Sequence, residues 1–497
     1  MRTSKRPLAR LAAAATAVGV VVLVAAAAAQ AYPYTLGPQV LVSGPSPFAS
    51  CTFGGNPADN FVNAEVEPFV AVNPRNAANI VGVFQQDRWR TVGGAHGLVA
   101  GWTKNGGATW GESWAALSAC AGADPADPGN ARSSDPWVTF DPAGNAYQIS
   151  ITFSSDETIS SVLVSKSTNG GVSWAAPKTL IRTQSDLTLN DKESITADPT
   201  RPGYVYAIWD QVATLPGQEN RGDQSFLHSF AYRAEPTFSR STDGGATWSP
   251  AVHLSSQNMF TIGHQIVVLP DGTLVDVFDT GHGSGLQPSP NQIFEGVMLS
   301  TDAGVTWTPP SRAANEASLP VIDPETGKEV RAGTNIPDVA VDTRSGTLYV
   351  VWADGRFSGG IHDDIALVKS TDGGKTWSAP VMVNAPAGVA AFTPAVAVSS
   401  DGTVGVTYYD IRNNTAAPGL TTDVWLAHSH DGGATWSEQH LAGPFDMETA
   451  PFARGYFVGD YEGLTAIGRD FMPFFVIANS GNTANRTDVF SIRAKAP

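Results

Sequence analysis

Apolar and polar residues alternate along most of this chain in short runs, and pairs of runs are joined by turns of Pro, Gly, Asp or Asn. Alternation with a period of two residues is typical of a β-strand with one buried face. Two such runs around a short turn predict a β-hairpin. The sequence contains seven of these hairpins, which begin near Glu67, Asp135, Glu193, His264, Pro337, Thr393 and Gly459.

An eight-residue pattern follows six of the hairpins. Its fullest copy is Ser370–Trp377, and successive copies lie 59 to 74 residues apart. An Asp or Asn before Gly-Gly predicts a tight turn, because its short side chain bonds backbone N–H groups ahead of it and Gly adopts a positive φ. We interpret the pattern as a structural turn between two strands. The turn positions are Asn105, Asn169, Asp243, Asp302, Asp372 and Asp431.

Each hairpin is followed by a third strand that enters the turn and a fourth that leaves it, as in Ile365–Lys369 and Ala379–Val383. Four antiparallel strands form one blade of a β-propeller. The last unit lacks a fourth strand, and Gly37–Val42 reads like the missing one, so we expect the N-terminal strand to complete this blade. The sequence therefore predicts an all-β fold with a single seven-bladed β-propeller over residues 32–497. A six-bladed propeller with an extra hairpin is the alternative.

The repeated turn resembles the Asp box of sialidase-like (BNR-repeat) proteins, many of them secreted by bacteria. This resemblance implies a propeller, and sialidases themselves have six blades. Sialidases bind the substrate carboxylate with three Arg and use a Tyr nucleophile assisted by a Glu, with an Asp as acid/base. Their Arg-Ile-Pro motif is absent here, so the first Arg of that set is not carried over.

The N-terminus has the pattern of an export signal. A basic region that contains Arg2, Lys5, Arg6 and Arg10 precedes an apolar stretch over residues 11–29, and a small-residue cleavage site follows. We predict a signal peptide over residues 1–31 and a secreted, extracellular protein without stable membrane insertion; an uncleaved anchor is the alternative. Outside the cell, Cys51 and Cys120 are expected to form a disulfide.

Charge narrows the expected partners. The chain carries a formal net charge of −16, and removal of the basic signal makes it more acidic. An acidic surface disfavours nucleic acid, whereas a local Arg cluster can still bind an anionic sugar. The nine His show no metal-ligand spacing. We expect no metal and no cofactor, a monomeric protein, and extracellular carbohydrate as its partner.

Long and irregular loops are expected on one face, around the mouth of the central channel, and sites favour such loops. Strands that end at this mouth carry an aromatic residue, an Asp and often an Arg. The expected substrate-binding residues are Arg88, Arg356, Arg412, Asp354, Tyr409 and Asp460. The expected catalytic residues are Tyr461, Glu462, Asp87 and Asp410.

In this hypothesis Tyr461 or Tyr409 is the nucleophile, with Glu462 beside Tyr461, and a carboxyl kept protonated by burial serves as the acid. In the alternative interpretation each Asp and Arg belongs to its own blade, with Asp capping a turn and Arg pairing with a neighbour. Three functions compete: a sialidase-like glycoside hydrolase, a non-catalytic glycan- or protein-binding propeller, and a polysaccharide lyase. We place the hydrolase first.

Overall fold

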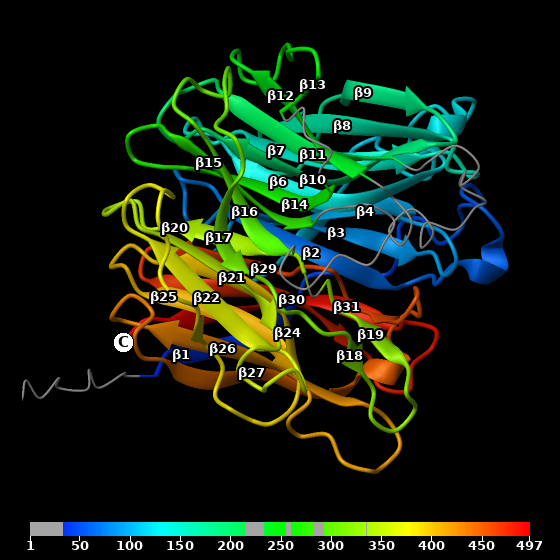
Figure 1. Ribbon diagram of the computed structural model, residues 1–497. Coiled ribbons are helices and arrows are strands. Elements are labelled where there is room, and N and C mark those ends of the chain that lie inside the picture. Colours follow the sequence, from blue (N-terminus) through cyan, green and yellow to red (C-terminus); the bar gives the residue numbers. More distant parts are fainter. Residues whose placement is uncertain (1–32, 214–232, 255–259, 282–292, 334) are drawn as a thin grey trace, which may run out of the picture. The chain divides into compact units, whose positions relative to one another are not determined.

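The computed structural model describes residues 33–213, 233–254, 260–281, 293–333 and 335–497 (Figure 1). Strands make up almost all of its regular structure, and the helices in the described ranges are single 3₁₀ turns, η1 (Pro57–Asp59), η2 (Pro128–Asn130) and η3 (Met447–Thr449). No helix of these ranges is long and apolar enough to cross a membrane. The predicted signal peptide lies outside the described residues and stays a prediction.

The described strands pair into successive antiparallel units of four, which we call blades 1 to 7. The first two blades are β2 (Glu65–Val72), β3 (Ile80–Arg88), β4 (Ala95–Thr103), β5 (Gly111–Ser113), and β6 (Arg132–Phe140), β7 (Ala146–Phe153), β8 (Ile159–Ser167), β9 (Lys178–Gln184). The next two are β10 (Thr188–Ala197), β11 (Val205–Ala213), β12 (Arg233–Ser241), β13 (Val252–His253), and β14 (Phe260–Val268), β15 (Leu274–Gly281), β16 (Phe294–Ser300), β17 (Ser311–Asn315).

Blades 5 and 6 are β20 (Asp338–Val341), β21 (Leu348–Asp354), β22 (Asp364–Ser370), β23 (Val381–Met382), and β24 (Ala391–Val398), β25 (Val404–Asp410), β26 (Thr421–Ser429), β27 (Ser437–Asp446). Blade 7 is β29 (Gly463–Ile467), β30 (Asp470–Ala478), β31 (Thr487–Lys495) and the N-terminal β1 (Thr35–Leu41). A separate small sheet joins β18 (Val321–Ile322), β19 (Glu329–Arg331) and β28 (Tyr456–Phe457).

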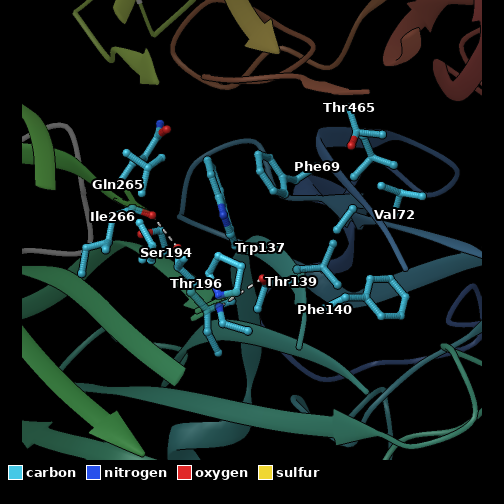
Figure 2. A pocket seen from close by; sticks show the side chains of 18 of the residues that line it. Phe69, Val72, Trp137, Thr139, Phe140, Ser194, Thr196, Gln265, Ile266 and Thr465 are labelled. Carbon is cyan, nitrogen blue, oxygen red and sulfur yellow. Dashed lines mark hydrogen bonds between the residues drawn. The ribbon is translucent and has the colours of Figure 1, made fainter. Parts of the chain in front are cut away.

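The N-terminal strand completes the last blade, as expected from the sequence. β1 pairs antiparallel with β31, with Gln39 opposite Ile492. The first strands of the blades contact one another in cyclic order, β2, β6, β10, β14, β20, β24, β29 and again β2. The predicted all-β propeller class is confirmed. Because the first strands are innermost, they line a central channel, part of whose wall is drawn in Figure 2.

The repeated turns have the expected structural role. In all six, an oxygen of the Asp or Asn accepts the backbone N–H four residues ahead, for example Asp372 from Thr376 at 2.9 Å and Asn105 from Thr109 at 3.0 Å. The Trp that ends the pattern links neighbouring blades, since Trp174 Nε1 donates to Ser113 Oγ of blade 1 at 3.0 Å. The turns thus stabilise blades and their junctions.

Cys51 and Cys120 form the predicted disulfide, with Cα atoms 5.6 Å apart. The bond joins the segment before β2 to the segment after β5, so it ties together the two loops that flank blade 1. Both loops lie on the face where the first strands begin.

Candidate functional site

The first strands of several blades share a distortion close to their start. In β2, β6, β10, β14 and β24 the pairing shifts register, and one residue at the shift has a positive φ: Glu67, Asp135, Lys192, Gly263 and Thr393. A β-bulge of this kind turns a side chain out of the strand's alternation. A positive φ is costly for residues other than Gly, and such strain gathers at functional sites. At three of these positions the side chain is charged, so the bulges are the first pointer to a site.

Two of these charged bulge residues, Glu67 and Asp135, contact the ammonium group of the third, Lys192. Lys192 Nζ lies 3.2 Å from Glu67 Oε1, 3.3 Å from Asp135 Oδ1 and 2.7 Å from Asp460 Oδ2. Asp460 comes from the segment before β29, so blades 1, 2, 3 and 7 contribute to a single group. We call Glu67, Asp135, Lys192, Asp460 and Arg331 the axial ion cluster. It is nearly closed to solvent, with Glu67 1% and Lys192 7% exposed.

Arg331 enters the cluster from β19 of the small sheet. Its Nε donates to Asp460 Oδ1 at 3.0 Å, and its Nη2 donates to Asp460 Oδ2. The guanidinium of Arg331 lies 4.2 Å from the centre of the Phe457 ring, and that of Arg88 lies 5.4 Å from the same ring. Nη1 of Arg331 and Nε of Arg88 have no hydrogen-bond partner among the described residues. Both side chains line a small cavity together with Glu67, Asp135, Asp191 and Lys192.

The pKa values of the carboxyl groups in the cluster are shifted in opposite directions. Burial and the neighbouring Asp135 raise the pKa of Glu67 well above its usual range, against the effect of Lys192. Burial also opposes ionisation of Asp460, but Arg331 and Lys192 outweigh it and lower the pKa of Asp460 well below its usual range. For Asp135, Lys192 and a hydrogen bond with Glu67 likewise outweigh burial and lower its pKa. The surroundings thus favour the neutral form of Glu67 and the ionised forms of Asp135 and Asp460.

Tyr461 lies beneath the cluster. Its ring centre is 5.5 Å from Lys192 Nζ, and its hydroxyl donates to the Pro136 carbonyl oxygen at 3.3 Å. Burial and the carboxyls of Glu67 and Asp135 raise the pKa of Tyr461 well above its usual range. The phenol is therefore kept neutral, which makes it a poor nucleophile in this state.

Glu462 and Tyr461 have different partners. The carboxyl of Glu462 interacts with Tyr409 and Asp338, and burial raises its pKa to about 8. The predicted pairing of Tyr461 with Glu462 as nucleophile and helper is therefore wrong.

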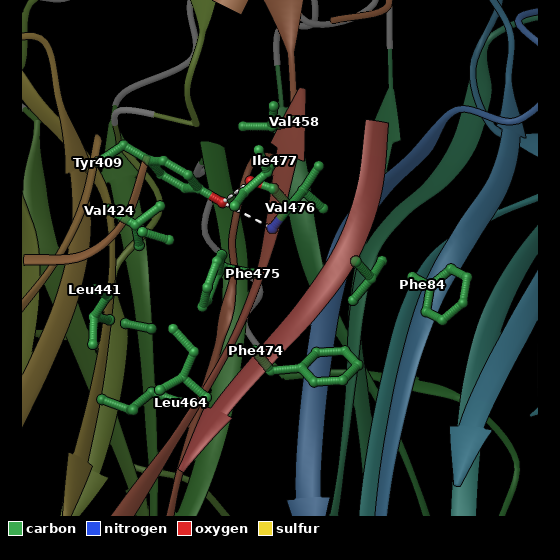
Figure 3. Packing of buried hydrophobic residues seen from close by; sticks show 14 of the residues in the cluster. Phe84, Tyr409, Val424, Leu441, Val458, Leu464, Phe474, Phe475, Val476 and Ile477 are labelled. Atoms are coloured by element: carbon green, nitrogen blue, oxygen red, sulfur yellow. Dashed lines mark hydrogen bonds between the residues drawn. The ribbon is translucent and has the colours of Figure 1, made fainter. Parts of the chain in front are cut away.

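Tyr409 is a core residue. It is 1% exposed, and its hydroxyl both donates to Val476 O and accepts from Val476 N, each at 3.0 Å (Figure 3). Val476 belongs to β30, so this contact joins blades 6 and 7. The expectation that Tyr409 binds substrate or acts as a nucleophile is wrong, because its hydroxyl is occupied inside the protein.

The three predicted Arg do not converge. Arg356 Nε donates to Asp354 Oδ1 at 2.7 Å within blade 5, and Arg412 pairs with Asp410 and Glu438 within blade 6. These two Arg and their Asp partners follow the alternative interpretation, in which they belong to their own blades. Arg88 alone of the three lines the axial cavity.

Asp87 is also a structural residue rather than part of the cluster. Its carboxylate accepts from Asn63 N at 2.9 Å and from Ser46 Oγ at 2.7 Å, and it lies 3.0 Å from His96 Nδ1. It therefore fixes the segment before β2. Of the predicted site residues, the structure brings Arg88, Asp460 and Tyr461 to one place.

Sequence reasoning missed Glu67, Asp135, Lys192 and Arg331. A signal was available for the first two, since each is a carboxylic acid directly before Pro at the start of a predicted hairpin. Lys192 stands at the corresponding position of the next hairpin. Arg331 had no such signal, because it comes from an insertion between blades 4 and 5.

Comparison with known proteins supports the resemblance. Residues 368–379 match the BNR/Asp-box repeat family. A sialidase of Bacteroides fragilis (strain YCH46) is 28% identical over 199 residues, which cover 36% of this chain and 34% of the sialidase. A xyloglucanase of Paenibacillus sp. is 26% identical over 269 residues, which cover 50% of this chain and 21% of the xyloglucanase. The chain thus spans about a third or less of the length of these relatives.

Among solved structures, the α-L-arabinanase of Penicillium chrysogenum complexed with arabinobiose matches with a TM-score of 0.47 and 12% identity, over 92% of this chain and 98% of that one. The predicted resemblance to sialidase-like, Asp-box repeat proteins is confirmed by the repeat match and the Bacteroides relative.

Proposed function

We propose that this Asp-box propeller is a secreted glycoside hydrolase whose catalytic carboxyl groups are those of the axial ion cluster. The observation that carries the proposal is the convergence of Glu67, Asp135 and Asp460 on one ammonium group, where the pKa of Glu67 is raised and those of the two Asp are lowered. Environments that push the pKa values of neighbouring carboxyls apart are typical of an acid and its partner base. The sialidase and xyloglucanase relatives are consistent with carbohydrate as the substrate.

Hydrolysis of a glycosidic bond needs two carboxyl groups in different states. In the proposed reaction Glu67 gives its proton to the leaving oxygen. Asp135 or Asp460 takes a proton from the water that attacks the anomeric carbon, so the glycosidic C–O bond breaks as a new C–O bond forms. Lys192 keeps that carboxylate ionised. Tyr461 remains a neutral side chain beneath the sugar, so the proposed chemistry does not use the Tyr nucleophile of sialidases.

We propose that the enzyme acts on an acidic sugar at the end of a glycan chain. Arg331 Nη1 and Arg88 Nε have no hydrogen-bond partner in the described part of the chain, and guanidinium groups bind carboxylates well. The cavity holds about 10 Å³, which is room for about one water, so it must open to admit a sugar. Exo-action of the sialidase type is proposed from the sialidase relative. From the export signal expected over residues 1–31, we propose that this activity lies outside the cell.

The test is hydrolysis by the purified protein of fluorogenic sialosides, glucuronides and neutral glycosides. Wild type is expected to turn over an acidic glycoside, and Glu67→Gln and Asp135→Asn are each expected to lose about 100-fold or more of kcat/KM. Asp186→Asn, at an exposed position, is the matched control and keeps full activity. The double variant Arg356→Ala, Arg412→Ala also keeps turnover, because those side chains lie outside the cluster. Absence of turnover by folded wild type on every substrate would contradict the proposal.

One observation favours a second function, a glycan-binding propeller without catalysis. The charges of the axial ion cluster already neutralise one another, and the cluster is almost closed to solvent. Calorimetric titration with acidic oligosaccharides separates the two: binding that Arg331→Ala weakens, with no product formed, identifies a binding protein.

A further inference from the structure

A second hollow lies on the other side of the aromatic layer beneath the axial ion cluster. It is a cavity of about 520 Å³ lined by the first strands of all seven described blades (Figure 2). Its rim is formed by turns that join first and second strands, with Pro74, Pro142 and Pro199. It therefore opens on the face opposite the proposed active site, and the proposed hydrolase does not use it.

The inner end of this cavity is closed by aromatic side chains. The rings of Phe69 and Trp137 stack with centres 3.5 Å apart, and Trp137 meets the edge of Tyr461 at 5.4 Å (Figure 2 shows the first pair). Tyr461 in turn lies under Lys192. The channel is thus divided into a charged compartment and a separate blind pocket.

The wall of the blind pocket is mostly apolar. Ile195, Ile266, Val339, Val396 and Leu464 contribute aliphatic surface from five different blades. A wall of this kind holds water poorly, because buried water needs two to four polar partners. The size also falls within the range of small-molecule sites, and such sites combine an apolar lining with few polar groups.

Three of the polar side chains that line the pocket are hydrogen-bonded within the protein. Gln265 Nε2 donates to Pro337 O at 2.8 Å, and Thr196 Oγ1 donates to Ile266 O at 2.7 Å. Asp338 Oδ2 accepts from Val396 N at 2.6 Å. Ser194 Oγ, by contrast, is buried and has no hydrogen-bond partner among the described residues. A buried hydroxyl without a partner is costly, so a ligand oxygen there would satisfy it.

We propose that this pocket is a binding site for a small, uncharged, largely apolar molecule whose carbonyl or hydroxyl oxygen accepts from Ser194. The molecule enters from the rim of Pro-containing turns, and its flat or aliphatic body lies against Phe69, Trp137 and the aliphatic wall. The seven strands that enclose the pocket exclude a folded partner, and the aliphatic wall disfavours a charged ligand.

The test uses Nile red, a neutral apolar dye that carries a carbonyl. Wild type is expected to give saturable, blue-shifted emission with one dye per chain. Ala71→Trp, which fills the pocket from blade 1, is expected to weaken the dye's Kd at least tenfold, and Ser194→Ala several-fold. Ala246→Trp is the matched control, because Ala246 is exposed in a turn outside the pocket, and it keeps the wild-type Kd.

If Ala71→Trp does not fold, as judged by circular dichroism, Thr465→Trp fills the same pocket from blade 7. Wild type without saturable binding would overturn the proposal. Unchanged binding in the folded variant that fills the pocket would also overturn it, because the dye would then occupy another place.

Discussion

Lys192 Nζ lies 2.7 Å from Asp460 Oδ2, although 268 positions separate the two residues in the sequence. One belongs to the first strand of blade 3, and the other precedes the first strand of blade 7. Their contact exists only because the first strands meet around a common channel. The same lysine reaches blades 1 and 2 through Glu67 and Asp135, so a single ammonium group fixes the relative positions of four blades.

Replacement of Lys192 should therefore lower the free energy of unfolding strongly. Lys192→Met leaves Asp135 without its cation and Asp460 with Arg331 alone, and breaking a buried ion pair from one side costs about 3–5 kcal/mol. We expect a loss of that size in the free energy of unfolding, measured with urea at pH 7. The loss should be smaller at low pH, where the carboxyls become protonated. The exposed Lys178→Met is the control, and a loss under about 1 kcal/mol for Lys192→Met would contradict the assigned role.

The disulfide should contribute to stability through the loop that it closes. Cys51 and Cys120 are separated by 69 positions, for which the chain-entropy relation gives about 4 kcal/mol. We expect the double variant Cys51→Ser, Cys120→Ser to lose about this much in urea unfolding. Addition of a reductant should destabilise wild type and leave the variant unchanged. Equal stability of the two proteins without reductant would show that the bond is not formed in solution.

Local sequence patterns predicted the repeat well because the interactions that create it are local. Each Asp-box turn is closed by a side chain and an N–H four residues ahead, and each hairpin by a short turn. The sequence also predicted that β1 completes blade 7, because Gly37–Val42 has the composition of the other fourth strands.

The candidate site was predicted only in part, because its residues meet through tertiary structure. Asp354 and Arg356 look like members of an active site in the sequence, yet their spacing of two residues lets them bond each other within one blade. Lys192 and Glu67 point into the channel because of β-bulges, which change the alternation that sequence reasoning assumes. Arg331 reaches the cluster from β19 of an inserted hairpin, which pairs with the distant β28 through tertiary structure.

The Asp-box turns offer a test of their structural role. Asp431 Oδ1 accepts from Thr435 N at 2.9 Å, and Oδ2 accepts from Thr435 Oγ1 at 2.7 Å. Asp431→Ala removes both bonds, and we expect a loss of about 1 kcal/mol, the usual cost of removing a capping carboxylate. Asp431→Asn should keep most of the stability, because Asn105 and Asn169 accept the same N–H in their own turns. Equal losses for both variants in urea unfolding would refute this account.

Glu462 should make the protein less stable as the pH rises. Burial raises the pKa of its carboxyl to about 8. The folded state therefore holds this proton more tightly than the unfolded state, whose Glu has a pKa of about 4.3. The resulting stability is complete below the unfolded pKa and is lost as the pH rises toward 8.

The slope of the unfolding free energy against pH tests this directly. Each titrating group changes that slope by at most about 1.4 kcal/mol per pH unit. Glu462→Gln removes the titrating carboxyl, so its stability should fall less steeply than that of wild type between pH 5 and 8. Glu329→Gln, at an exposed position, should keep the wild-type slope. Parallel curves for wild type and Glu462→Gln would mean that the carboxyl of Glu462 is already ionised in the folded protein, with a partner that neutralises it.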